Sequence, residues 1–286
     1  MITVLCATGA ESEMDEVSQP AFRPQDISYQ STGGVAWITL RRPQKLNALT
    51  WSSIGELEHA FGIAEEDDAV RVIVIAGEGR GFCSGLDLGA NVPQPDDHPR
   101  PGSARAGTLR SRHLYVSRVY NCRKPVIAAV NGVAAGTGMS LALACDIRIL
   151  STDASFCAAF VKRAAVADTG SSWLLPRLIG SERALRMLWT GRIVPAEEAV
   201  QIGLASELVA PDHLRDRVQE VASELARGPS LAIEFDKQLV RQAFHRSLED
   251  QVQLEEYFLQ TTRASHDAAE GLASFREKRD PVFEGR

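Results

Sequence analysis

The sequence contains few cysteines, and their arrangement suits neither a disulfide framework nor a zinc site. Both kinds of site need closely grouped cysteines. No two cysteines stand at C-x-x-C spacing here; the five are Cys6, Cys83, Cys122, Cys145 and Cys157. The six histidines include no pair at metal-binding spacing and no H-E-x-x-H motif. We therefore expect neither disulfides nor a bound metal.

Long apolar runs and an excess of positive charge are also absent. No run approaches the roughly 18 apolar residues that a membrane-spanning helix needs. The first residues carry neither the basic segment nor the long apolar segment of a signal peptide. Because 31 basic and 37 acidic residues leave a net charge of −6, the chain has no overall attraction for nucleic acid or anionic lipid. We expect a cytoplasmic protein with neither a nucleic-acid nor a membrane partner.

The sequence does contain the alternation of strand and helix patterns that is typical of an α/β fold. Hydrophobic residues make up 44% and charged residues 24% of the 286, which is enough for a sizeable core. Gly33 and Gly34 separate two short strand patterns and predict a hairpin. A capping box at Ser53 and Glu56 predicts the start of a helix, and the apolar run 70–76 predicts a strand covered on both faces. Further predicted elements are strands at 126–130 and 147–150 and a short helix that ends near Ala144.

The chain divides into three parts. Residues 1–24 are rich in acidic residues and show no sustained period, so we predict a flexible N-terminal extension. Residues 25–210 form the predicted α/β core, and residues 211–286 are mostly helical in pattern. Residues 91–108 contain four prolines and two glycines, and a loop of this length in a compact enzyme is often a lid.

Two turns rich in small residues follow predicted strands. One contains Gly136 and Gly138 and opens a helix, where unpaired N–H groups attract negative charge. A dinucleotide site is one interpretation of this turn, but Leu141 stands where the third glycine belongs, and the helix is short for such a crossover. A tight packing turn without a ligand is another interpretation.

The second turn, residues 81–88, suits an electrostatic role better than a nucleophilic one. Ser84 does not lie in a G-x-S-x-G elbow, so a hydrolase nucleophile is unsupported. Both turns expose backbone N–H donors at strand ends. Two such donors aimed at one point would form an oxyanion hole for a carbonyl that gains negative charge during reaction.

Five segments stand out along the chain, in this order: ITLRRPQKLNAL at 38–49, GFCSGLDL at 81–88, PVIAAVNG at 125–132, PAEEAVQIGL at 195–204 and FREKR at 275–279. Together they resemble the enoyl-CoA hydratase/isomerase family, the crotonase superfamily. The resemblance runs from about residue 26 to the C-terminus.

The resemblance implies an α/β fold built as a crotonase-like spiral of ββα units, with a C-terminal helical trimerisation region. It also implies an acyl-CoA thioester as substrate, with coenzyme A as part of that substrate and no separate cofactor. The assembly it implies is a homotrimer or a dimer of trimers. Subunit packing would then cover the apolar helix face formed by Leu214, Val218, Val221 and Leu225.

The resemblance also assigns roles to particular residues. The backbone N–H groups of Leu86 and Thr137 would form the oxyanion hole. Phe275 and Lys278 would reach the coenzyme A of a neighbouring subunit, although Lys278 could equally be a solvated surface charge. The other residues that it places along the substrate are Lys45, Leu46, Ala48, Ser84, Gly85, Asp87, Gly136 and Phe160.

The sequence departs from the hydratases of this family at both catalytic positions. Those enzymes add water to a conjugated double bond with two glutamates, which act as acid and base. The corresponding positions here hold Ser140 and Phe160, and neither side chain can act as a carboxylate. Ordinary hydratase chemistry is therefore expected to be lost.

Asp168 remains as a candidate catalytic carboxylate. From its own surroundings, it is an N-cap for a helix that starts near Gly170. From the resemblance, it matches the aspartate that acts on the acyl chain in crotonase isomerases, such as the dienoyl-CoA and ring-1,2-epoxyphenylacetyl-CoA isomerases. The sequence following it, TGSSWLLPR, resembles the latter group closely.

His113 is the second candidate. It lies 24 positions before Thr137, the spacing at which a histidine activates water in the 4-chlorobenzoyl-CoA dehalogenase branch. That branch has a tryptophan where this chain has Phe160, and a partly buried structural histidine is the alternative interpretation. An isomerase that uses Asp168 is the leading hypothesis. A dehalogenase- or hydrolase-like enzyme that uses Asp168 with His113, and a catalytically silent CoA-ester-binding protein, are the rivals.

Overall fold

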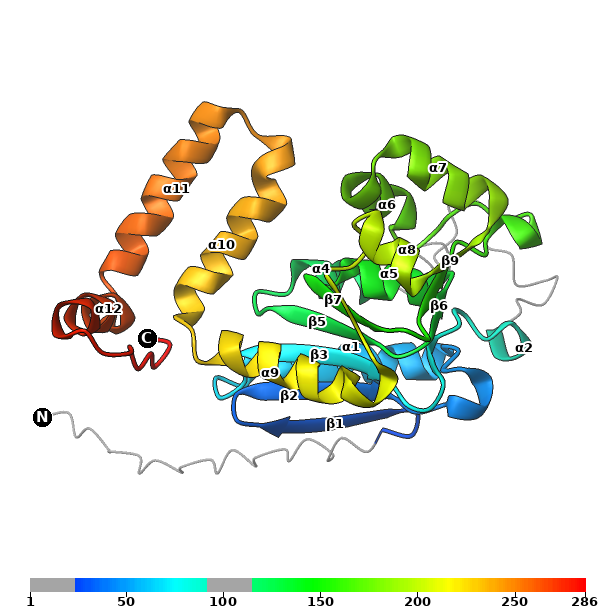
Figure 1. The fold of residues 1–286 in the computed structure, drawn as a ribbon, viewed down its shortest axis with the longest axis horizontal. Coiled ribbons are helices and arrows are strands. Elements are labelled where there is room, and N and C mark those ends of the chain that lie inside the picture. The colour runs from blue at the N-terminus through cyan, green and yellow to red at the C-terminus, as the bar shows by residue number, and fades with distance from the viewer. Residues whose placement is uncertain (1–23, 92–114) are drawn as a thin grey trace, which may run out of the picture.

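The computed structural model describes residues 24–91 and 115–286, and its strands form two sheets around a shared core (Figure 1). The larger sheet has the strand order β1-β2-β3-β5-β7-β10, and the smaller has the order β4-β6-β8-β9. The strands are β1 Ile27–Thr32, β2 Val35–Leu40, β3 Val72–Gly77, β4 Gly81–Cys83, β5 Val126–Val130, β6 Val133–Ala135, β7 Ile147–Ser151, β8 Ser155–Cys157, β9 Ile193–Pro195 and β10 Glu207–Val209.

Helices follow the strands and cover the sheets. The α-helices are α1 Trp51–Glu66, α2 Leu88–Asn91, α4 Tyr115–Asn121, α5 Thr137–Ala144, α6 Ser171–Ile179, α7 Ser181–Thr190, α8 Ala196–Gln201, α9 Leu214–Ala226, α10 Ser230–Gln242, α11 Leu248–Arg263 and α12 His266–Glu277. Single 3-10 turns are η1 Pro43–Lys45, η3 Val161–Arg163, η4 Pro211–His213 and η5 Ala243–His245.

The chain winds as a spiral in which the two sheets receive strands alternately. Strands β3, β5 and β7 lie side by side and parallel in the larger sheet. Their successors β4, β6 and β8 lie parallel in the smaller sheet, and a helix follows each pair. The structure thus confirms the predicted α/β spiral of ββα units. The predicted hairpin is also confirmed, because β1 and β2 pair antiparallel around Gly33 and Gly34.

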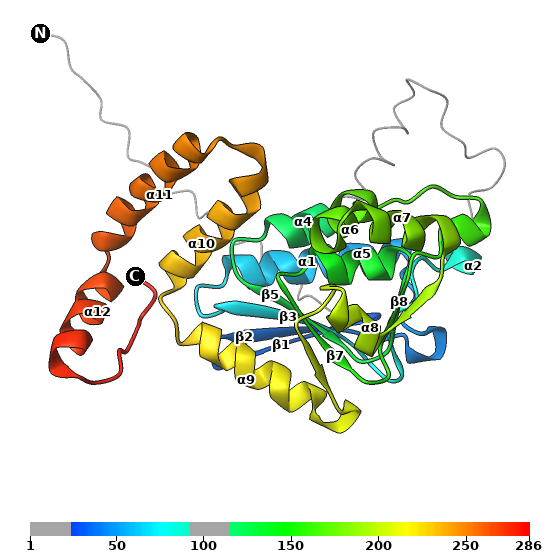
Figure 2. The same ribbon diagram turned by 45° about the horizontal axis from the view of Figure 1, so that its top comes forward.

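Strand β3 is buried on both faces, as its apolar run predicts. Ile73 and Ile75 point into the main core, whereas Val72 and Val74 belong to a second cluster beneath α9. This division follows from the two-residue period of a strand. In Figure 2, α9 lies on one side of the larger sheet and α1, α4 and α5 on the other.

Helix α1 begins earlier than the sequence predicts. Thr50 is its N-cap, and Thr50 and Ser53 satisfy each other's backbone N–H groups. The predicted capping box at Ser53 and Glu56 is therefore wrong. Because Thr50 already occupies the capping position, the Glu56 carboxylate is free to accept hydrogen bonds from the chain just before β1, at 2.8 Å from the Asp26 nitrogen.

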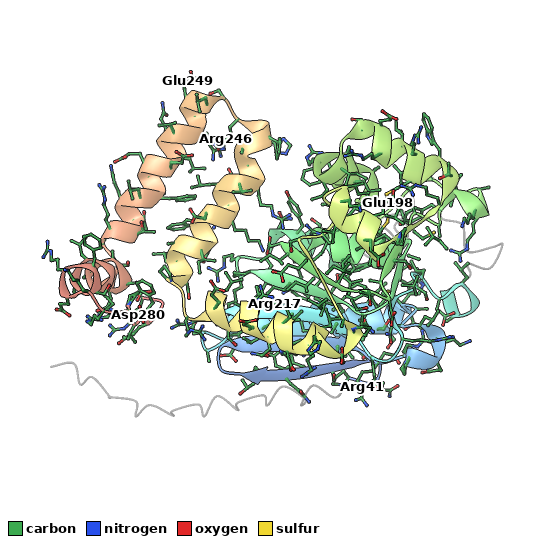
Figure 3. The ribbon with its side chains drawn as sticks, in the orientation of Figure 1. Arg41, Glu198, Arg217, Arg246, Glu249 and Asp280 are labelled. Carbon is green, nitrogen blue, oxygen red and sulfur yellow. The ribbon has the colours of Figure 1, made fainter. Side chains whose placement is uncertain are left out.

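Helix α9 corrects another expectation. Leu214 and Val218, which were expected to require subunit packing, are buried against the larger sheet of their own chain. Helices α10 to α12 instead form an arm that extends from the core (Figures 1 and 3), and Arg246 and Glu249 mark the tip of its α10–α11 hairpin. Ion pairs of Lys237 and Arg241 with Asp146 join α10 to the core. None of these three helices has a buried large hydrophobic residue.

Across residues 24–91 and 115–286, no helix combines the length and apolar composition needed to cross a bilayer. Residues 1–23 of the predicted N-terminal extension, residues 92–108 of the predicted loop and His113 lie outside the described residues.

Candidate functional site

The turn after β4 is fixed by a neighbouring loop, residues 42–49. Ser84 donates a backbone hydrogen bond of 2.9 Å to the Leu46 carbonyl, and its hydroxyl lies 3.1 Å from the Lys45 carbonyl. Asn47 is buried, adopts a left-handed backbone with φ +57°, and donates 2.7 Å to the Gly81 carbonyl. The loop and the turn therefore form one rigid unit.

An isolated parallel bridge orients the N–H group of Leu86. The Leu49 nitrogen lies 2.7 Å from the Gly85 carbonyl oxygen, and the Asp87 nitrogen lies 2.8 Å from the Leu49 carbonyl oxygen. In this pattern the residues on either side of Leu86 face the loop, so the Leu86 N–H points away from it. Within the described part of the chain, this N–H donates to no protein acceptor.

The glycine turn presents a second backbone donor. Gly136 has φ +53° and is the N-cap of α5, so Thr137 is the first helical residue. The first N–H groups of a helix have no intrahelical acceptor, and the helix dipole adds a partial positive charge there.

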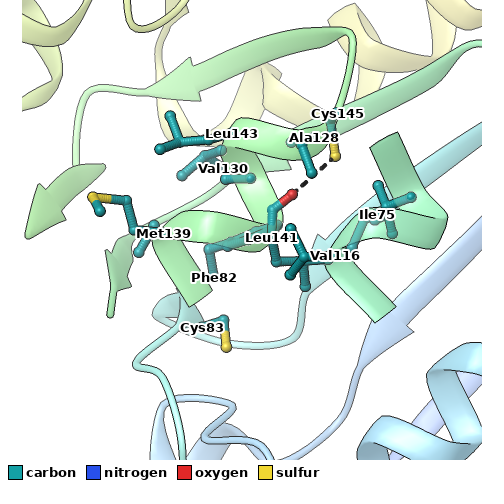
Figure 4. Packing of buried hydrophobic residues seen from close by; sticks show 14 of the residues in the cluster. Ile75, Phe82, Cys83, Val116, Ala128, Val130, Met139, Leu141, Leu143 and Cys145 are labelled. Atoms are coloured by element: carbon teal, nitrogen blue, oxygen red, sulfur yellow. Dashed lines mark hydrogen bonds between the residues drawn. The ribbon is translucent and has the colours of Figure 1, made fainter. Parts of the chain in front are cut away.

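The two turns meet backbone to backbone. A methyl group built on Gly85 would lie 3.7 Å from the Thr137 nitrogen. One built on Gly138 would lie 2.2 Å from the Cys83 carbonyl oxygen, so only glycine allows this contact. Figure 4 shows the buried cluster behind the turns, where Phe82 and Cys83 of β4 lie near Leu141 of α5. Donors held this way are suited to binding a developing oxyanion.

Tyr115 contacts the side chain of Thr137, the residue that carries the second backbone donor. Its hydroxyl shares a hydrogen bond with Oγ1 of Thr137, and both side chains are buried. Burial raises the pKa of Tyr115 well above its usual range, and the negative charge of Asp168 adds to the increase. Tyr115 therefore stays neutral and acts here as a hydrogen-bonding partner of Thr137.

We expect Tyr115→Phe to lower the free energy of unfolding by about 1–3 kcal/mol, because it leaves the Thr137 hydroxyl buried without its partner. Urea unfolding measures this change, and Tyr257→Phe on the exposed face of α11 is a matched control. The double variant Tyr115→Phe with Thr137→Ala should recover part of the loss, since both partners are then removed. An unchanged unfolding free energy in Tyr115→Phe would show that this hydrogen bond does not stabilise the turn.

The positions that correspond to the hydratase glutamates hold one apolar side chain and one hydroxyl that is hydrogen-bonded to the backbone of its own helix. Ser140 is fully buried, and its hydroxyl lies 3.4 Å from the Gly136 carbonyl in the same helix. Phe160 is 8% exposed, and its ring lies 3.9 Å from where a Gly136 methyl group would stand. Phe160 therefore forms a wall of the glycine turn.

Asp168 is half-buried, and its side chain does not cap α6. Gly170 is the N-cap, with no side-chain cap, and Ser171 bonds to the main-chain carbonyl of Asp168. The interpretation of Asp168 as a helix cap is therefore wrong; Gly170 with φ +81° turns the chain into the helix without it.

The Asp168 carboxylate has one hydrogen-bond donor. The Thr169 hydroxyl donates to Oδ1 at 3.0 Å, while Oδ2 has no protein donor within residues 24–91 and 115–286. Thr169 is also backbone-strained, because a β-branched residue at φ +47° is rare. Such strain persists where the surrounding structure enforces it, often at functional sites.

The loop residues expected to contact coenzyme A lie beside the first turn. Lys45 is exposed, Leu46 half-buried and Ala48 buried. Asp87 mainly supports this loop, because Arg42 donates to it at 2.9 Å and thereby lowers the pKa of its carboxyl.

Phe275 and Lys278 lie far from this site in the same chain. Phe275 is 84% exposed on α12, and Lys278 follows at the C-terminal end of that helix. Figure 1 places α12 at the far end of the arm, away from β4 and α5. These residues do not complete the site of their own chain.

The described residues contain no group of three or more His, Cys, Asp or Glu side chains arranged to hold a metal. Cys83 lies against Gly138 of the glycine turn, and burial raises the pKa of its thiol to about 12. It is therefore protonated and packs as a small apolar residue.

Comparisons with known proteins agree along nearly the whole chain. A family model described as enoyl-CoA hydratase/isomerase matches residues 30–286. The 1,2-epoxyphenylacetyl-CoA isomerase of Escherichia coli (strain K12) is 36% identical over 253 residues, which cover 88% of this chain and 96% of that protein. The (E)-benzylidenesuccinyl-CoA hydratase of Thauera aromatica is 33% identical over 260 residues, covering 91% and 99%.

Solved structures lead to the same family. The crystal structure of an enoyl-CoA hydratase from Bacillus anthracis superposes with a TM-score of 0.83 at 31% identity, covering 92% of this chain and 100% of that chain. The family match, the relatives and the shared fold together show that this chain belongs to the enoyl-CoA hydratase/isomerase family of acyl-CoA enzymes.

Proposed function

We propose that this protein isomerises an acyl-CoA thioester, moving a proton along the acyl chain through an enolate. The observation that carries the proposal is the placement of carboxylates. Ser140 and Phe160 replace both hydratase glutamates, whereas the Asp168 carboxylate does not cap α6 and accepts a hydrogen bond from the Thr169 hydroxyl. The alternative that uses His113 rests on a residue outside the described part of the chain.

In the proposed mechanism, the thioester oxygen accepts hydrogen bonds from the backbone N–H groups of Leu86 and Thr137. These bonds strengthen as negative charge develops, which acidifies the carbon beside the thioester. Asp168 takes the proton from one carbon and returns it to another, so that a double bond shifts with no net change in composition. No residue other than Asp168 needs to change its protonation state.

Coenzyme A is proposed to lie along Lys45, Leu46 and Ala48, next to the oxyanion hole, with no further cofactor. The hydrogen bonds between residues 42–49 and the turn after β4 support this placement, because they hold the loop at the mouth of the site. Lys45 adds a positive charge where the coenzyme's phosphates would lie.

We also propose a homotrimer or a dimer of trimers. The arm supports this assembly, since apolar side chains on it are exposed, among them Phe244 at 73% and Tyr257 at 65%. Apolar patches of this kind usually mark subunit contacts. Light scattering should give three or six times the chain mass of 31.1 kDa, and a monomer at micromolar concentration would refute the assembly.

The names of the relatives include both isomerases and hydratases, so the reaction type needs a direct test. Mass spectrometry of a panel of acyl-CoA esters in deuterated water separates the two reactions. Hydration adds the mass of one D2O and places one of its deuterium atoms on carbon, whereas isomerisation adds only the deuterium that the Asp168 carboxyl gains by exchange with solvent before it reprotonates the chain. We expect deuterium incorporation without water addition for the substrate.

Hydration of crotonyl-CoA in particular should be very slow. General acid–base groups contribute about 10²–10⁴-fold each, and neither Ser140 nor Phe160 supplies one. Hydration is followed by loss of the conjugated thioester absorbance. Turnover at the rate of an ordinary hydratase would refute the proposed reaction.

A further inference from the structure

A cavity of about 390 Å³ lies between α4 and the start of α6, beside the proposed site. Val116 lines it and directly follows Tyr115, the residue that contacts Thr137. Thr169 also lines it and hydrogen-bonds to Asp168. The cavity lining therefore includes a residue that contacts Asp168 and a residue next to the one that contacts Thr137.

Two aromatic side chains form one wall of this cavity. The rings of Tyr120 and Trp173 meet edge to face, with centroids 5.1 Å apart and an interplanar angle of 90°. The same two residues line a second cavity of about 410 Å³ on the side of α10. The aromatic pair is thus a partition between the two cavities.

Two arginine side chains stack on the aromatic pair on the side that faces α10. The Arg241 guanidinium lies 3.4 Å from the centroid of the Tyr120 ring. The Arg177 guanidinium lies 3.7 Å from that of Trp173. Both arginines line the α10-side cavity and neither lines the cavity beside Asp168. The rings are therefore fixed in place, and the charges lie outside the cavity proposed for the acyl group.

The other walls are apolar near the site and polar at the opening. Val116 and Leu174 are 3% and 6% exposed. Ser117 and Asn121 lie at the exposed edge, where they hydrogen-bond to each other at 3.1 Å. Apolar walls with a polar rim suit an apolar group better than a charged one.

The size and rigidity of the walls favour a ring. A cavity of about 150 Å³ lined by apolar side chains can hold benzene, so this one has room for a ring with substituents. Fixed aromatic walls favour edge-to-face or offset contacts with another ring, whereas a straight chain loses more rotational freedom on binding.

We propose that this cavity binds an aromatic acyl group and that Trp173 and Tyr120 determine this specificity. The inference rests on the proposed function, because the oxyanion hole and Asp168 orient the thioester toward the cavity.

Binding of two non-reacting thioesters tests the proposal. Phenylacetyl-CoA and octanoyl-CoA carry the same number of acyl carbons and no double bond to move. By titration calorimetry on the full-length protein, we expect phenylacetyl-CoA to bind about fivefold to tenfold more tightly. Trp173→Leu should abolish most of this preference and Trp173→Phe should retain it, while the affinity for free coenzyme A stays unchanged in both.

Trp189→Leu is the matched control, because Trp189 is 71% exposed on α7 and lies away from the cavity lining; it should keep the wild-type preference. Equal binding of the two esters by the wild type would overturn the proposal, as would a preference that survives Trp173→Leu. The wild-type comparison and Trp173→Phe decide the question even where Trp173→Leu does not fold. These measurements involve no proton transfer, so the subsite can fail while Asp168-dependent exchange succeeds, or the reverse.

Discussion

Asp168→Asn is expected to lower kcat by about 10²–10⁴-fold, the usual contribution of a general acid–base group. Asparagine has nearly the same shape as aspartate, and its amide oxygen can still accept the 3.0 Å hydrogen bond from the Thr169 hydroxyl. It cannot take up a proton from carbon. Deuterium incorporation from solvent into the acyl chain should therefore fall with kcat, while the affinity for a saturated CoA ester stays nearly constant.

Stability measurements separate this role from a structural one. Gly170 caps α6 without help from the Asp168 side chain, so Asp168→Asn should change the unfolding free energy little. Asp153→Asn, in the exposed turn between β7 and β8, is a matched control and should leave kcat unchanged. Equal deuterium exchange in wild type and Asp168→Asn would exclude Asp168 as the base and would direct the search to His113.

The sequence predicts the fold well wherever a local pattern has one structural solution. The run at β3 allows only a strand covered on both faces, and Gly33 with Gly34 allows only a tight hairpin. The start of α1 is less well predicted, because both Thr50 with Ser53 and Ser53 with Glu56 could form a capping box. The sequence alone does not show which of the two pairs forms. The covering of Leu214 and Val218 depends on how α9 folds back on the sheet, which no local pattern specifies.

The candidate site is predictable in part. Leu86 and Thr137 follow from the turns and the resemblance, since backbone donors depend on turn geometry more than on side chains. Tyr115 was missed, because its contact with Thr137 joins residues 22 positions apart across two elements. The aromatic pair of Tyr120 and Trp173 was missed for the same reason; its ring geometry arises from packing between α4 and α6.

The strain at Thr169 could not be predicted either. Threonine strongly avoids positive φ, so the sequence gives no sign of a left-handed residue beside Asp168. The sequence instead favours a capping role for Asp168, which is the commonest use of aspartate before a helix. The structure excludes that role through the adjacent left-handed pair Thr169 and Gly170, and the carboxylate is consequently available for the proposed proton transfer.

Gly138→Ala should be the most damaging substitution of a single hydrogen atom by a methyl group in the described part of the site. The new methyl would lie 2.2 Å from the Cys83 carbonyl oxygen and 2.7 Å from its sulfur. Neither group can move freely, because Cys83 belongs to β4 and is fully buried. We expect a loss of about 1–3 kcal/mol or more in the unfolding free energy from overpacking, measured by urea unfolding.

The same substitution should reduce the activity of the protein that does fold. Relieving the clash separates α5 from β4, and with them the two proposed donors, the Thr137 N–H on α5 and the Leu86 N–H in the turn after β4. Misplacing one oxyanion donor costs about 10²–10³-fold in kcat, so kcat per folded molecule should fall by that order. Gly55→Ala is the matched control, since a methyl there meets nothing within 4 Å on the exposed face of α1, and it should stabilise the helix by about 0.5–1 kcal/mol. A folded Gly138→Ala protein with the kcat of the wild type would show that the close contact between the two turns does not set the position of the donors, and the oxyanion hole would then have to be sought elsewhere.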